Sequence, residues 1–152
     1  PVIDLDEFDA WYQAKSAADA VRCVTSARAS VTKLTVSDLG FGEADVFNFT
    51  IALADHRKLV RLQIKQCRFG DACVERLAAA LYRNAWLQNL SLEGNSISDD
   101  GVGHLARALE RNETLLSLNL SRNRITDRGC QDLTDAMQEN HSITVLDLVG
   151  NK

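Results

Sequence analysis

A pattern of apolar residues recurs every 28 residues along most of this chain. The two clearest copies run from Leu87 to Thr114 and from Leu115 to Ser142, and they match at nearly every apolar position. Counting in both directions from them gives repeats that start at residues 31, 59, 87, 115 and 143. A fixed period of this length predicts a solenoid, because one such unit buries its apolar face only by stacking on its neighbours.

Each copy begins with apolar residues at its first, fourth and sixth positions, which predicts a short strand with one face turned inward. The fourth position carries Leu34, Leu62, Leu90, Leu118 and Leu146. The ninth position carries an asparagine in the later copies, namely Asn95, Asn123 and Asn151. An asparagine side chain can bond backbone groups that a tight turn would otherwise leave unpaired, so we expect a structural asparagine column.

The second half of each copy has the features of an amphipathic helix. Ser98-Asp99 and Thr126-Asp127 supply the residue types preferred at a helix N-cap. Inward positions then follow at helical spacing, as in Val102, Leu105 and Leu109. Strand and helix therefore alternate, which predicts an α/β fold with a parallel sheet, right-handed crossovers and helices on the outside.

Residues 1–30 do not fit the repeat, and we expect them to form an N-terminal helical cap over the first core layer. Leu5, Phe8, Trp11 and Tyr12 recur at helical spacing, and Ser16 can start a second helix. Trp11 would be core in this cap, or alternatively an anchor for a partner. The cap and the repeats of residues 31–152 would make one structural domain.

The pattern LxxLxLxxNxIxDxGxxxLxxAL resembles leucine-rich repeats of the ribonuclease-inhibitor type. The resemblance covers residues 31–152, although Leu39 and Asp45 replace the usual asparagine and glycine in the first copy. It implies a horseshoe with the sheet on the concave side and helices on the convex side. The chain stops soon after the fifth strand, so we expect a fragment of a longer protein with an uncapped edge that could contact another molecule.

Composition and motifs argue against several classes of function. The formal net charge is -4 and no apolar run is long enough to span a membrane, so neither nucleic acid nor a membrane is an expected partner. The four cysteines show no CxxC pair, which favours reduced thiols in the cytoplasm. No phosphate-binding loop, nucleophile elbow or metal-ligand cluster is present, so we predict no enzyme activity, no cofactor and no metal.

The concave face is the candidate binding surface. Its strand and loop positions carry seven basic residues and three acidic ones, Asp38, Glu93 and Asp147. Since like charges on neighbouring strands repel, this predicts a docking surface for an acidic protein, unless the face is an ordinary solvated one. Val145 and Val149 point to the same side and could add an apolar contact, and Trp86 is either an exposed anchor or packed under its loop. The basic residues are Lys33, Arg61, Lys65, Arg68, Arg122, Arg124 and Lys152.

We therefore predict a non-catalytic scaffold or adaptor that binds a protein partner through its concave face. One alternative is a regulator of a small GTPase, because the repeat type is similar to that of the Ran GTPase-activating protein. That family has more repeats and an acidic tail, which are missing here. Another alternative is a module that binds actin, microtubules or ciliary structures, because tropomodulin carries a similar short array. The expected location is cytoplasmic and could include the cytoskeleton.

Overall fold

The computed structural model describes residues 11–26 and 31–152. Within these ranges, strands and helices alternate in sequence order. The strands are β1 (Trp11–Gln13), β2 (Lys33–Ser37), β3 (Arg61–Lys65), β4 (Asn89–Ser91), β5 (Ser117–Asn119) and β6 (Val145–Asp147). The helices are α1 (Ala17–Thr25), α2 (Glu43–Ala54), α3 (Asp71–Arg83), α4 (Asp99–Leu109) and α5 (Asp127–Glu139).

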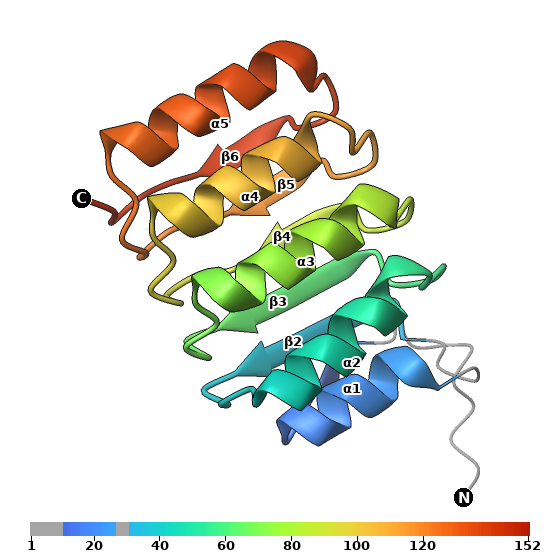
Figure 1. Ribbon diagram of the computed structural model, residues 1–152. Helices are drawn as coiled ribbons and strands as arrows, with labels where there is room; N and C mark the ends of the chain where they lie inside the picture. The colour runs from blue at the N-terminus through green and yellow to red at the C-terminus, as the bar shows by residue number, and fades with distance from the viewer. Residues whose placement is uncertain (1–10, 27–30) are drawn as a thin grey trace, which may run out of the picture.

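All six strands form one parallel sheet in sequence order, and the five helices cover one face of it (Figure 1). The strand register pairs Leu34 with Leu62, Leu62 with Leu90, and so on through Leu118 to Leu146. The expected leucine column is therefore confirmed, and with it the right-handed α/β solenoid. No helix in the described residues is long and apolar enough to cross a bilayer.

The core lies between the sheet and the helices. The leucine column meets inward helix residues such as Val74, Leu77 and Leu105, all fully buried. Burying one such side chain contributes about 1.5–3 kcal/mol relative to leaving it in water. In the early repeats three phenylalanines fill this layer: the Phe41 ring meets Phe49 and Phe69 edge-on, with centroids 5.8 and 5.5 Å apart.

The N-terminal part differs from the expected pair of helices. The helix expected to include Trp11 and Tyr12 is wrong at these two residues, which lie in β1 and pair with β2. A strand at this place hydrogen-bonds the edge of β2, as the Ala14 N–H does with Thr35 O at 2.8 Å, whereas a helix would leave that edge open. Leu5 and Phe8 lie outside the described residues.

The second expected helix is present as α1 and is fixed by a buried carboxylate. Ser16 Oγ accepts from the Asp19 N–H at 3.1 Å, as an N-cap residue should. The Asp19 carboxylate accepts from Tyr12 Oη and Arg22 Nη2, each at 2.6 Å. These donors lower the Asp19 pKa to about 2, while the bond to Asp19 raises the Tyr12 pKa to about 12. The N-terminal cap therefore consists of a strand and a helix, and the hydrogen bond between the Tyr12 and Asp19 side chains joins them.

A first set of asparagines joins each turn after a strand to the turn of the previous repeat. Asn95 Oδ1 accepts from the N–H groups of Cys67 and Phe69 at 2.9 and 3.2 Å, and its Nδ2 donates to Ile64 O at 2.7 Å. Asn123 makes the same kind of contact one repeat later. Cys67 holds the corresponding place and only donates, through its thiol, so the first turn has a weaker version of this bond.

A second set of asparagines follows the helices. Asn84 Nδ2 donates to Leu53 O at 2.6 Å in the previous repeat, and its Oδ1 accepts from Leu87 N at 2.8 Å. Asn112 and Asn140 repeat this arrangement. Both ends of the later repeats are therefore tied to the neighbour by buried hydrogen bonds. Such bonds matter because an unpaired buried backbone group costs about 1–3 kcal/mol.

The helix starts differ from expectation in one detail. Ser98 and Thr126 stand at the N-caps, but neither side chain accepts a bond from its own helix. Each hydroxyl instead donates, at 2.6 Å, to an aspartate of the previous repeat: Ser98 to Asp71 and Thr126 to Asp99. The N-cap side chains of Ser98 and Thr126 therefore join neighbouring repeats instead of capping their own helices.

Candidate functional site

The face of the sheet opposite the helices is the candidate surface, and we call it the open face. It carries the third, fifth and seventh residue of each repeat, because side chains alternate along a strand. No other element of the described residues covers it (Figure 1). Its residues are Lys33, Thr35, Ser37, Arg61, Gln63, Lys65, Asn89, Ser91, Glu93, Ser117, Asn119, Ser121, Val145, Asp147 and Val149.

Five of the seven predicted basic residues divide into two groups. Lys65 and Arg122 share one carboxylate, with Lys65 Nζ 3.4 Å and Arg122 Nη1 3.7 Å from the Glu93 oxygens. Arg61, Arg68 and Arg124 have no ion pair within the part of the chain that the structure describes. The sheet register places Lys33 directly beside Arg61. Glu93 therefore offsets part of the positive charge, and the remainder is concentrated on β3 and the loops after the strands.

A shallow hollow of about 240 Å³ lies in the middle of the open face. Thr35 Oγ1 donates to Gln63 Oε1 at 3.2 Å beside it, and the buried Ser91 Oγ has no hydrogen-bond partner in the described residues. A buried hydroxyl without a partner costs stability, and this oxygen lies beneath the surface of the hollow. Side chains that line the hollow include Arg61, Gln63, Lys65, Asn89, Ser91, Ser117 and Asn119.

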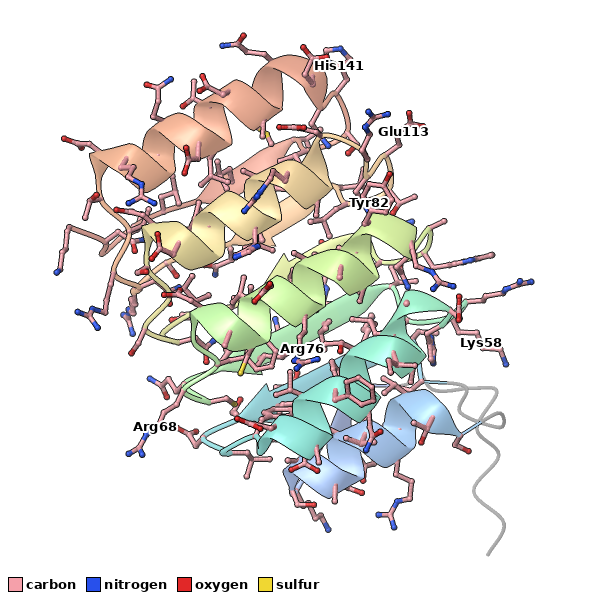
Figure 2. All side chains as sticks on the ribbon, in the orientation of Figure 1. Lys58, Arg68, Arg76, Tyr82, Glu113 and His141 are labelled. Carbon is pink, nitrogen blue, oxygen red and sulfur yellow. The ribbon has the colours of Figure 1, made fainter. Side chains whose placement is uncertain are left out.

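Three of the predicted arginines lie in the loops that follow the strands. Arg68 and Arg122 have left-handed backbones, with φ of 54° and 55°, and Arg124 lies two residues after Arg122. Their side chains are exposed, and Figure 2 shows Arg68 on the rim where strands pass into helices. The asparagine bonds beneath hold the backbone of this rim, so the arginines extend from fixed points.

Two predicted apolar residues lie at the far end of the open face. Val145 begins β6 and is 55% exposed, and Val149 follows that strand and is 76% exposed. They lie beyond Ser117 and Ser121, away from the basic residues on β3. The structure does not bring them together with Arg61 and Lys65. Lys152 follows Asn151, whose side chain bonds Ile125 N at 3.0 Å.

Two of the thiols and one of the imidazoles have surroundings that suit a structural role. Burial raises the pKa of the Cys67 and Cys73 thiols, which disfavours the reactive thiolate. His56 Nδ1 accepts from Leu59 N at 3.0 Å and thus stands where later repeats have an asparagine. Among the described residues, no group of three or more histidine, cysteine or acidic side chains is arranged to hold a metal ion.

Sequence reasoning missed a second set of exposed residues on the helical side. Phe47 and Ile51 of α2 are 48% and 54% exposed. Trp86, in the loop after α3, was expected to be either exposed or packed under its loop, and it is half exposed. A signal was present: the segment FNFTIALA is apolar on every side, whereas an outer helix needs only one apolar stripe. Val46 and Phe49, two of the buried residues of this helix, account for only part of its apolar side chains.

Comparisons with known proteins agree with this architecture. A family model described as Leucine Rich repeat matches residues 83–106 and 111–133. A solved structure described as leiomodin-1 actin-binding site 2 is similar, with a TM-score of 0.76, 20% identity, and coverage of 88% of this chain and 78% of that one. The tropomodulin C-terminal domain of Caenorhabditis elegans has a TM-score of 0.73 and 11% identity, over 87% of this chain and 81% of that one. No curated protein sequence matches this chain.

Proposed function

Because this chain is a leucine-rich repeat protein, we propose that it is a non-catalytic module that binds a protein partner through its open face. The observation that carries the proposal is the uncovered parallel sheet, whose outward side chains contribute little to the core. Such a sheet holds side chains at fixed spacing, with strands about 4.8 Å apart, and so presents a surface organised before binding.

The chemistry of this face favours an acidic partner. Arg61 lines the central hollow, and Arg68 and Arg124 extend from the adjacent rim, all without carboxylates of their own in the described residues. Arginine pairs with carboxylates through two parallel hydrogen bonds, which gives both affinity and orientation.

The test is charge reversal at Arg61 and Arg68. The chain is immobilised, proteins are captured from a cell extract and identified by mass spectrometry, and the captured set is compared with that of Arg61→Glu/Arg68→Glu. We expect the variant to lose the acidic proteins that the parent captures through its open face, since repulsion replaces attraction at two points. A control, Arg107→Glu/Arg128→Glu, makes the same charge change on the helical side and should retain them. Equal capture by both variants would rule out the open face.

A cytoskeletal partner is a second candidate, supported by the similarity to a domain described as an actin-binding site of leiomodin-1. We propose actin as the first protein to test, and the cytoskeleton as the location that this would imply. Cosedimentation with actin filaments should carry the chain into the pellet, and its absence at micromolar concentrations would remove this candidate. The GTPase-regulator alternative and the ribonuclease-inhibitor subtype remain predictions.

A further inference from the structure

A groove between α2 and α3 on the helical side is a second surface with distinct chemistry. It encloses about 260 Å³ and is lined by Phe47 and Ile51 of α2 and by Arg76, Ala79 and Arg83 of α3, among others. The two exposed apolar side chains lie one helical turn apart, and the small side chain of Ala79 leaves the space open. Figure 2 shows Arg76 between the two helices.

The repeat register shows that the fold does not require these apolar residues. Later repeats carry Glu75, Gly103 and Gln131 at the position of Phe47. At the position of Ile51 they carry Ala79, Arg107 and Asp135. In the later repeats, where these outward positions only have to allow stacking, they therefore carry polar or small residues. Exposed large apolar groups gathered in one place are typical of interaction sites.

The charged groups indicate which partner fits. Arg76 lies over the Phe47 ring, 5.5 Å from its centroid, and has no carboxylate partner in the described residues. Arg83 pairs with Asp55 at 3.2 Å, where both side chains are largely exposed. The two arginines are seven residues apart on α3, which is two turns or about 10.5 Å along the helix.

The groove between α4 and α5, further along the helical side, has the opposite character. Its lining includes Asp99, Asp100, Glu110, Asp132 and Asp135 against only two arginines. An acidic partner is therefore repelled there and attracted to the groove between α2 and α3. An acidic partner that lies along the helical side therefore meets one groove that attracts it and another that repels it.

We propose that the groove between α2 and α3 binds an acidic amphipathic helix of another protein. Apolar residues of that helix, four apart, contact Phe47 and Ile51, and carboxylates two turns apart pair with Arg76 and Arg83. A helix in an apolar groove is a recurrent mode of peptide recognition. This surface lies on the side opposite the open face, so one surface can be occupied while the other is free.

The probe is a synthetic alanine-rich helical peptide of about five turns, with leucines four apart and glutamates seven apart. Its fluorescence anisotropy is followed with the full chain. We expect saturable binding that weakens at least tenfold when lysines replace the glutamates. We also expect amide NMR shifts confined to α2 and α3. Binding that does not distinguish glutamate from lysine, or no binding, overturns the proposal.

Variants assign the contact to named residues. Phe47→Gln introduces the residue that the fourth repeat carries at this position, and Arg76→Glu reverses the charge. Each should weaken binding at least tenfold, with an unchanged circular dichroism spectrum. Arg128→Glu, which makes the same charge change on α5, should have no effect. Parent-like binding by both groove variants contradicts the inference.

Two other occupants would also overturn it. If the chain sediments as a dimer that Phe47→Gln converts to a monomer, the groove is a contact between copies. If a peptide of residues 1–10 displaces the probe at a tenfold lower concentration than the unlabelled probe does, the groove belongs to the beginning of this chain. The Arg61→Glu/Arg68→Glu variant should bind the probe normally, which separates this test from that of the open face.

Discussion

Replacing Asn95 by alanine should be one of the most damaging single substitutions in this chain. The side chain is fully buried, and its Oδ1 accepts from two backbone N–H groups of the previous repeat, those of Cys67 and Phe69. Alanine leaves both donors without a partner in a dry interior, at about 1–3 kcal/mol each. With partial relaxation we expect a loss of about 3 kcal/mol in the free energy of unfolding. A domain of this size has about 5–15 kcal/mol in total, so the variant should still fold.

Urea unfolding followed by far-UV circular dichroism measures this loss as a lower midpoint at unchanged slope. The control is Asn89→Ala, because Asn89 is half-buried on the open face and its side chain has no hydrogen bond in the described residues. It should change stability by less than about 0.5 kcal/mol. Asn151→Ala should be intermediate, since Asn151 is less buried and accepts from only one backbone N–H.

The order of the three urea midpoints tests whether the asparagine bonds between repeats stabilise the fold. If Asn95→Ala and Asn89→Ala unfold at the same urea concentration, the bonds between repeats add no net stability and the reasoning is wrong. A large loss at Asn151 with none at Asn95 would contradict the dependence on burial.

Four further substitutions test other parts of the structure. Gln66 has a left-handed φ of 52° and is exposed, so Gln66→Gly should raise stability by about 0.5–1 kcal/mol in urea unfolding. Gly101→Ala should lower it by about 2 kcal/mol, because the added Cβ would overlap Asp71 Oδ1. By contrast, Gly103→Ala on the same helix meets its nearest atom at 3.5 Å and should raise stability by up to about 1 kcal/mol, so a loss at both sites would contradict the close approach. Burial lowers the pKa of His56, so its contribution to stability is complete above pH 6.5, its ordinary pKa, and is lost as the pH falls below that value. His56→Asn should remove this slope in unfolding free energies measured between pH 7 and 5, and an unchanged slope would exclude His56 as its source.

Periodic features of this fold could be predicted from the sequence. Leu90 and Leu118 stand at equal positions in equal repeats, and equal spacing alone places them on adjacent parallel strands. The N-terminal part was less predictable, because Trp11 and Tyr12 suit a helix locally. They form a strand because β2 offers an edge to pair with, and pairing across the chain overrides local spacing.

The candidate surfaces were only partly predictable for a related reason. Register assigns Arg61 and Lys65 to one face, but it does not show that Glu93 is close enough to contact Lys65 and Arg122 at once. This contact depends on the side-chain conformations of all three residues, which belong to three successive repeats. Phe47 was missed for a different reason: only the inward positions of each helix were considered, although a helix has more positions than the core can accept.

The asparagine bonds have a consequence for how this protein can change. Asn95 and Asn123 bond only backbone atoms of the turns they join, so these cross-links are indifferent to which side chains the strands carry outward. Mutations on the open face can therefore accumulate without loosening the stack. Selection is free to alter the surface chemistry of this face while the scaffold stays the same.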